Sequence, residues 1–95
     1  MRYAQADGNQ AEIAAVLRAA GCSVQSLHAV GGGVPDLLVG RAGMTFLLEV
    51  KRLIGKRRPH AAPMKDTQVA WHAAWRGQVA VVTTPEEALA AVGLR

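Results

Sequence analysis

Two short apolar segments joined by a glycine-containing turn constrain this chain more than any other feature. The first covers residues 34–39 and is Val-Pro-Asp-Leu-Leu-Val, and the second covers residues 44–52 and contains Thr-Phe-Leu-Leu-Glu-Val. Residues 40–43, Gly-Arg-Ala-Gly, separate them, and two strands with a short glycine-containing loop form an antiparallel hairpin. Pro35 is acceptable because the first residue of a strand need not donate to the ladder. The fold must therefore be built around this hairpin.

The residues on either side of the hairpin predict three helices and two further strands. Upstream, apolar residues at helical spacing predict a helix over residues 8–20, and a weak alternation predicts a strand over residues 22–30. Downstream, we expect a helix that begins at Asp66 or Thr67 and a near-continuously apolar strand over residues 78–83. Thr84-Pro85-Glu86-Glu87 is a typical helix start, so a last helix should run to about Val92.

The order helix, strand, strand, strand, helix, strand, helix predicts an α/β fold. We expect a small mixed sheet of about four strands flanked by helices, because the hairpin is antiparallel and a strand–helix–strand connection favours a parallel pair with a right-handed crossover. A chain of 95 residues has room for one modest core, so residues 1–95 should form a single domain. Residues 52–63 are basic and rich in turn formers, and we expect a mobile, irregular loop there.

The composition narrows the class of partner. The net charge is +4 and the isoelectric point is near 10.0, and basic domains often bind polyanions, most commonly nucleic acid. Solubility alone would explain the same charge. A single cysteine excludes an intrachain disulfide, and no apolar run approaches the ~20 residues of a membrane span. The N-terminal residues contain no apolar signal region, so we expect a cytoplasmic protein without a membrane partner.

The hairpin register brings two carboxylates together. If the turn centres near Ala42, Asp36 lies opposite Leu48 or Glu49. Side chains alternate along a strand, so Glu49 and Lys51 share a face that Asp36 can share. Directly opposed residues have Cβ atoms ~5 Å apart, and two carboxylates at that separation repel each other unless a cation or a proton lies between them. Mg²⁺ fits such a pair, because it accepts one or two carboxylates and keeps water as its other ligands.

These residues suit phosphodiester hydrolysis. A metal ion polarises a phosphoryl oxygen and lowers the pKa of a bound water, and a lysine beside that water orients it or offsets charge on the pentavalent phosphate. The alternative is an ordinary salt bridge between Glu49 and Lys51 on one face of a strand. However, the segment is apolar at both odd and even positions, which predicts a covered sheet, and buried charges need a partner or a function. We therefore favour an active site.

The same residues resemble a known signature. Pro35-Asp36, followed by Glu49-Val50-Lys51 at the end of the next strand, is similar to the PD-(D/E)XK motif of restriction-endonuclease-like nucleases. Gly-Val-Pro-Asp-Leu-Leu-Val and Leu-Leu-Glu-Val-Lys resemble the VRR-NUC group and its archaeal Holliday-junction-resolvase relatives. The signature covers residues 33–51, and the order of elements extends the likeness over most of the chain.

This resemblance implies an activity and a set of roles. It implies a Mg²⁺-dependent endonuclease, with Mn²⁺ as a substitute, that hydrolyses DNA phosphodiester bonds. Branched DNA is a candidate substrate, and phage or DNA-repair biology is a candidate context. Asp36 and Glu49 would ligate the metal, the backbone carbonyl of Val50 would be a third ligand, and Lys51 would be the catalytic lysine. Resolvase-like relatives act as dimers, so by analogy we expect a homodimer.

The resemblance also suggests two accessory residues. Such nucleases often carry a further acid on the first helix, and Glu12 is the candidate metal ligand here, although an ordinary solvated glutamate is the alternative. Relatives also carry a glutamine on the helix after the lysine, and Gln68 matches it. Gln68 would lie on the same helical face as Trp71 and Trp75, from which it could reach the site or a phosphate. The alternative is a half-exposed residue in the first helical turn.

Several residues are candidates for contact with DNA. The basic run Lys56-Arg57-Arg58 could bind phosphates, and such binding should weaken with salt. Ser26 and His28 could both point from the first strand toward the site, or be ordinary strand residues. The three histidines, His28, His60 and His72, have no metal-ligand spacing.

Two other hypotheses compete with the nuclease. The chain could be a DNA-binding module that keeps the nuclease fold without catalysis and acts with a partner protein, which its small size favours. It could also be an α/β interaction domain in which the aspartate, glutamate and lysine are coincidental. The combined motif, hairpin and basic segment make that last hypothesis the weakest.

Overall fold

The computed structural model describes residues 8–95, and it is a small α/β domain as the sequence predicts. In chain order its elements are α1 (Gly8–Ala19), β1 (Ser23–Ser26), β2 (Leu37–Arg41), β3 (Met44–Val50), β4 (Leu53–Ile54), β5 (His60–Ala61), α2 (Asp66–Ala74), β6 (Ala80–Val82) and α3 (Pro85–Ala91). Within residues 8–95 no helix is long and apolar enough to cross a membrane.

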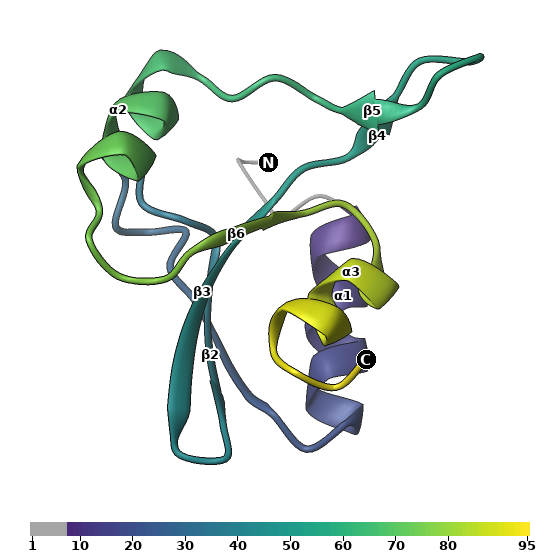
Figure 1. Ribbon diagram of the computed structural model, residues 1–95, viewed down its shortest axis with the longest axis vertical. Helices are drawn as coiled ribbons and strands as arrows, with labels where there is room; N and C mark the ends of the chain where they lie inside the picture. The colour runs from purple at the N-terminus through teal and green to yellow at the C-terminus, as the bar shows by residue number, and fades with distance from the viewer. Residues whose placement is uncertain (1–7) are drawn as a thin grey trace.

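The main sheet is mixed and has the strand order β1-β2-β3-β6. β1 and β2 are antiparallel, β2 and β3 form the antiparallel hairpin, and β3 and β6 are parallel. The predicted four-stranded mixed sheet is therefore confirmed. Between β3 and β6 the chain leaves the sheet through β4, β5 and α2 and then returns (Figure 1). Because β3 and β6 are parallel, this excursion leaves from the end of β3, where the candidate site lies, and crosses back to the start of β6 toward the opposite end of the sheet.

The hairpin turn is tighter than the sequence suggests. Arg41 pairs with Met44, so only Ala42 and Gly43 form the loop, and both have positive φ, 52° and 78°. Positive φ at both central residues defines a type I′ turn, whose backbone twist matches that of the flanking strands. The turn pairs Leu37 with Leu48 and thereby sets the register of the whole hairpin.

The core occupies one face of the sheet. Side chains of alternating positions in β2 and β3 point into it, and α1 and α3 cover it together (Figure 1). The core cluster consists of Ile13, Leu17, Cys22, Leu37, Val39, Phe46, Leu48, Val50, Val82, Ala88 and Val92. The residues between them in the strands, including Glu49, point to the other face of the sheet, which is the side on which α2 lies. The helices therefore lie on both sides of the sheet, as predicted.

α3 begins as the sequence predicts. The Thr84 hydroxyl accepts a hydrogen bond from the Glu87 backbone N–H at 3.1 Å, and Pro85 occupies the first turn. The Glu87 carboxylate in turn accepts hydrogen bonds from the backbone N–H and the hydroxyl of Thr83 at 2.7 and 2.8 Å. These bonds hold the pKa of Glu87 below its usual value, because they favour the ionised form.

The first strand is shorter than predicted. β1 ends at Ser26, although the pattern suggested a strand to Val30. The Leu27 N–H still bonds to the Asp36 carbonyl at 2.8 Å, but the next residue of the partner strand is Pro35, which has no N–H to offer. The chain therefore leaves the sheet and turns, with the Val30 N–H bonded to the Leu27 carbonyl at 2.9 Å.

Residues 52–63, which the sequence predicts to be irregular, contain one short regular element. β4 and β5 form an antiparallel two-stranded ribbon in which Leu53 pairs with Ala61 and Ile54 with His60. Glycine at position 55, with φ 94°, permits the turn beyond β4. Figure 1 shows this ribbon extending away from the body of the domain. The periodicity was missed because two residues per strand are too few to show an alternation.

Candidate functional site

Charged and polar side chains gather in a pocket at the end of β3. Six of the predicted site residues line it: His28, Asp36, Glu49, Val50, Lys51 and Gln68. They come from the segment between β1 and β2, from β3 and its end, and from α2. The other lining residues are Gln10, Arg52, Ala62 and Lys65. The structure therefore brings together residues that the sequence places on separate elements.

The two carboxylates face each other as predicted. Continuing the hairpin register by one residue beyond Leu37 and Leu48 places Asp36 opposite Glu49. The Asp36 Oδ2 accepts a hydrogen bond from the Val50 backbone N–H at 2.7 Å, which fixes this carboxylate against the end of β3. The Glu49 side chain is almost completely buried, with 1% of its surface exposed. An acidic pair thus lies at the base of the pocket.

Burial and proximity change the protonation of Glu49. The pKa of Glu49 is raised from 4.5 to about 8, chiefly by burial and further by a hydrogen bond with Asp36 and repulsion from it, while the Lys51 ammonium opposes the shift. Without another cation, the acidic pair therefore retains a proton at neutral pH. A divalent cation between the two carboxylates would displace that proton, because ligating carboxylates must be ionised.

Gln68 connects the lysine to the buried glutamate. The Lys51 Nζ donates to the Gln68 Oε1 at 2.7 Å, and the Gln68 Nε2 donates to the Glu49 Oε2 at 3.1 Å. The Lys51 Nζ lies 4.0 Å from the same Glu49 oxygen. The Gln68 Oε1 also accepts the backbone N–H of Lys65, at the N-terminus of α2, at 2.9 Å. Gln68 therefore holds the Lys51 ammonium in a fixed position beside the carboxylates.

His72 is a site residue that sequence reasoning missed. It lies one helical turn after Gln68, and its Nε2 is 3.6 Å from the Glu49 Oε1. Both atoms are buried, and neither has a hydrogen-bond partner among residues 8–95. A separation of four residues on α2 was the available signal, because it places His72 and Gln68 on one helical face. The two residues therefore contact different oxygens of the same carboxylate.

α1 brings Gln10 to the pocket and does not bring Glu12. The Glu12 side chain is exposed, whereas Gln10 is buried, with 8% of its surface exposed, and lines the pocket. Gln10 lies three residues before the buried Ile13, on the helical stripe that packs against the sheet. Glu12 lies outside that stripe. This stripe was the signal that could have identified Gln10.

The predicted DNA-contacting residues lie in three different parts of the structure. His28 lines the pocket with Asp36, and so could contact a substrate there. Ser26 is exposed and does not line the pocket, and its hydroxyl accepts the His28 backbone N–H at 3.2 Å. The basic run Lys56-Arg57-Arg58 lies at the exposed tip of the ribbon, away from the pocket.

The residues of the pocket fit a hard cation with oxygen ligands. Two carboxylates face each other, and the Glu49 Oε1 is buried without a hydrogen-bond partner. Within residues 8–95, however, no three His, Cys, Asp or Glu side chains form a metal-binding group. Asp36 and Glu49 would therefore hold the ion, with the Val50 carbonyl and water as further ligands. Mg²⁺ accepts a set of this kind, since it usually keeps several waters.

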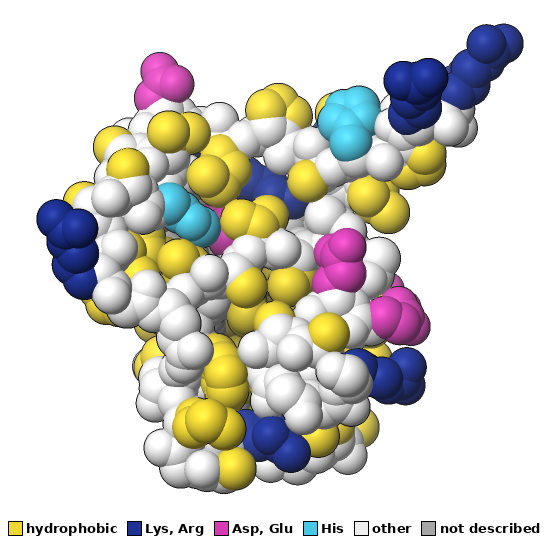
Figure 2. All heavy atoms as spheres, viewed as in Figure 1, with side chains coloured by type: hydrophobic (Ala, Val, Ile, Leu, Met, Phe, Trp, Pro, Cys, Tyr) yellow, Lys and Arg dark blue, Asp and Glu magenta, His cyan; other side chains and the backbone are white. Residues whose placement is uncertain are grey.

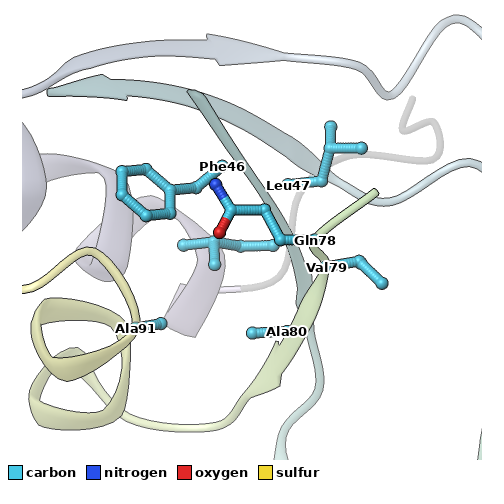
Figure 3. A pocket seen from close by; sticks show the side chains of 7 residues that line it. Phe46, Leu47, Gln78, Val79, Ala80 and Ala91 are labelled. Atoms are coloured by element: carbon cyan, nitrogen blue, oxygen red, sulfur yellow. The ribbon is translucent and has the colours of Figure 1, made fainter. Parts of the chain in front are cut away.

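A second pocket, between β3, β6 and α3, has different chemistry. The residues that line it are mostly apolar: Phe46, Leu47, Leu48, Gln78, Val79, Ala80 and Ala91 (Figure 3). The Gln78 amide donates to the Thr45 carbonyl, and the lining contains no charged side chain. This pocket offers neither metal ligands nor an acid–base group, so we place the site at the end of β3.

No model of a known protein family matches the chain, and neither does any curated protein or solved structure. The functional argument therefore rests on the motif and on the geometry of its residues.

Proposed function

We propose that this chain is a metal-dependent deoxyribonuclease that hydrolyses phosphodiester bonds. One observation carries the proposal. The buried Glu49 carboxylate faces Asp36. The Lys51 Nζ lies 4.0 Å from the Glu49 Oε2, where a hydrogen bond to Gln68 holds it. An ordinary surface salt bridge would not explain the burial, because desolvating a carboxylate is costly without a compensating partner or a function.

Each side chain has a defined task in this reaction. A bound Mg²⁺ supplies Lewis-acid polarisation of the phosphoryl oxygen and a more acidic water. Asp36 and Glu49 would hold the cation at the end of β3. The Lys51 ammonium lies next to them, where it can orient the attacking water or stabilise the extra negative charge of the pentavalent phosphate. Gln68 keeps the Lys51 side chain from turning away into solvent.

Basic residues around the acidic pair support a nucleic-acid substrate. Arg52 and Lys65 line the same pocket as Lys51, so three cationic side chains share the pocket with the two carboxylates. Such an arrangement attracts a phosphate, while the carboxylates remain available for the metal. The choice of DNA, and of branched DNA in particular, rests on the resemblance of residues 33–51 to the VRR-NUC and resolvase groups.

The first test is metal-dependent cleavage by the wild type and by Lys51→Ala. Supercoiled plasmid and a synthetic four-way junction are incubated with Mg²⁺, Mn²⁺ or EDTA. We expect cutting with either metal and a loss of about 100-fold or more in Lys51→Ala, the usual effect of removing a charge-stabilising group. Arg76→Ala, which removes an exposed cation away from the pocket, is the matched control and should cut normally.

Two outcomes would redirect the assignment. Full metal-dependent activity in purified Lys51→Ala would contradict the mechanism. Well-folded wild-type protein that binds DNA in a salt-sensitive manner but never cuts would favour a non-catalytic DNA-binding module that acts with a partner protein.

The proposal includes a homodimer, because two symmetric cuts require two sites. Sedimentation equilibrium with and without a four-way junction measures this directly. A protein that remains monomeric on the junction would limit the activity to single-strand cuts.

A further inference from the structure

The β4–β5 ribbon is anchored at the candidate site by both of its legs. Lys51, which lies in the pocket, is two residues before β4, and Lys65 and Gln68 follow β5. The Ala62 N–H bonds to the Arg52 carbonyl at 2.9 Å and closes the base of the ribbon, and both residues line the pocket. β4 and β5 pair only with each other and form a sheet of their own. The ribbon is therefore an arm that projects from the site (Figure 1).

The tip of this arm has a defined backbone. The His60 Nδ1 lies 2.9 Å from the Arg58 carbonyl, within hydrogen-bond distance. Gly55 has φ 94°, and a Cβ there would lie 2.9 Å from the Arg58 carbonyl oxygen. The turn is thus closed on itself, and it holds Lys56, Arg57 and Arg58 at the end of the arm.

Positive charge follows the arm from the pocket to the tip. Between Glu49 and Asp66 the sequence contains no acidic residue and six of the 11 lysines and arginines of the chain, namely Lys51, Arg52, Lys56, Arg57, Arg58 and Lys65. The three tip residues are exposed. Within the part of the chain that the structure describes, none of the three forms an ion pair. Figure 2 shows dark blue side chains at the end of the arm, beyond the body of the molecule.

We infer that this arm lies in a groove of duplex DNA beside the cleaved phosphate and that the substrate must be double-stranded there. The inference rests on the proposed function. Paired strands are ~4.8 Å apart, and the major groove of B-form DNA, ~12 Å wide, admits a two-stranded β-ribbon. Exposed cations at the tip then meet phosphates on both sides of the groove. Duplex RNA is excluded as the preferred partner, because its major groove is too deep and narrow for side chains to enter.

The length of the arm determines how many base pairs of duplex the protein contacts beside the cut. Arg57 is six residues beyond Lys51. At about 3.3 Å per residue an extended chain spans at most ~20 Å over that distance, which corresponds to roughly six base pairs of duplex DNA. The arm therefore contacts phosphates up to about half a helical turn from the cut, on one side of it.

The binding test uses the Lys51→Ala protein, so that no cutting interferes. Affinity for a duplex DNA of about 20 base pairs is measured over a salt series. Removing the three tip cations together (Lys56→Ala, Arg57→Ala, Arg58→Ala) should reduce the slope of log K against log salt by about 2–3, and Arg57→Ala alone by about 1. Arg76→Ala, another exposed cation outside the arm, should change the slope much less. Circular dichroism checks that each variant is folded.

Two further nucleic acids distinguish groove binding from general attraction to phosphate. We expect the triple tip substitution to change the salt slope for duplex RNA and for single-stranded DNA by less than 1. An equal change for all three nucleic acids, or no change for duplex DNA, would overturn the inference.

A cleavage experiment separates this inference from the proposed function. In this experiment the duplex is shortened from one end toward the cut. The wild type should lose cleavage when fewer than about six base pairs remain on the side of the arm. The triple tip variant should cleave slowly at every duplex length. If binding follows the tip but nothing is ever cut, the proposed activity is wrong and the arm remains a duplex-binding element. If cutting is normal and the wild type and the tip variant respond identically to length, the arm inference is wrong and the nuclease remains.

Discussion

Glu49 is a buried carboxylate that opposes folding whenever it is ionised without a cation. Burial, with a smaller contribution from Asp36, raises its pKa to about 8. When the pKa of a group is higher in the folded than in the unfolded protein, its protonated form stabilises the fold. For Glu49 this contribution is fully present below the unfolded pKa, near 4.5, and it is lost as the pH rises through the folded pKa. The metal-free protein should therefore lose stability between about pH 5 and 8.

Glu49→Gln should remove this pH dependence. The glutamine keeps an oxygen that can accept the Gln68 Nε2 hydrogen bond, but it cannot ionise. In EDTA at pH 9 we expect the variant to have a free energy of unfolding about 1–3 kcal/mol higher than that of the wild type, with a much smaller difference at pH 5. Urea denaturation at the two pH values measures both. The same pH dependence in wild type and variant would contradict the assignment of the raised pKa to Glu49.

His72 should act as a positioning residue for Glu49. Its Nε2 lies 3.6 Å from the Glu49 Oε1, so a small rotation allows the imidazole N–H to donate to this oxygen and orient the carboxylate. Removing a side chain that orients a metal ligand typically lowers metal affinity 10–100-fold. We therefore expect His72→Ala to need a 10–100-fold higher Mg²⁺ concentration for half-maximal cleavage. Its kcat at saturating Mg²⁺ should stay near that of the wild type.

The control for His72 lies on the same helix. Val69→Ala shortens a side chain of α2 that is 51% exposed, and it should leave the Mg²⁺ requirement unchanged. His72→Gln, which keeps a donor, should restore part of the affinity. A reduced kcat with an unchanged Mg²⁺ requirement would show that His72 does not act through metal binding.

At the scale of elements, the β2–β3 hairpin positions the site through its two-residue turn. Because side chains alternate with a period of two, a slip of one residue in this turn would move Glu49 to the core face and Leu48 to the pocket. Ala42 occupies one of the two turn positions with a φ of 52°, a conformation that costs a non-glycine residue energy. The register therefore depends on a turn whose sequence is not optimal.

Ala42→Asn should stabilise the hairpin without changing its register. Asparagine followed by glycine is the most favoured pair for a type I′ turn, because asparagine tolerates positive φ better than alanine does. We expect the free energy of unfolding to rise by about 0.5–1 kcal/mol, measured by urea denaturation. Gly43→Ala, at φ 78°, should lower it by a similar amount. A destabilising Ala42→Asn would show that the turn is not type I′ in solution.

At the scale of the whole molecule, core and site are separated by the sheet. α1 and α3 cover one face of the sheet, and the apolar residues of that face form the core. Glu49 points to the opposite face, where α2 supplies Gln68 and His72. Charged residues can therefore meet at the end of β3 without interrupting the apolar packing. The cost of bringing them together appears in the stability of the entire domain, since small domains unfold cooperatively.

Divalent cations should consequently stabilise the whole domain. A ligand that binds only the folded state at 100 times its dissociation constant adds about 2.7 kcal/mol to the free energy of unfolding. Mg²⁺ or Mn²⁺ should therefore raise Tm by several degrees in differential scanning calorimetry, and EDTA should reverse the rise. Asp36→Asn should abolish the shift. Glu12→Gln is the matched control, because Glu12 is exposed on α1 and should not affect it. Equal shifts in Asp36→Asn and wild type would place the cation elsewhere.

The sequence alone determined the features that depend on near neighbours along the chain. The order of the elements of the main sheet, the hairpin and the start of α3 follow from periodicity, turn residues and capping residues within a few positions of one another. The sequence also limited the residue opposite Asp36 to Leu48 or Glu49, and the two-residue turn of the structure then decided for Glu49. The period-two alternation then placed Lys51 on the face of Glu49.

Only the tertiary structure decided how the helices and the ribbon meet that hairpin. α1 docks by its apolar stripe, and the rotation that buries Ile13 and Leu17 brings Gln10 into the pocket and leaves Glu12 in solvent. The docking of α2 places His72 against Glu49, and the β4–β5 ribbon extends from the site as a paired arm. These arrangements depend on packing between segments far apart in sequence. No local pattern specifies that packing, because it is fixed only when all the apolar surfaces are buried together.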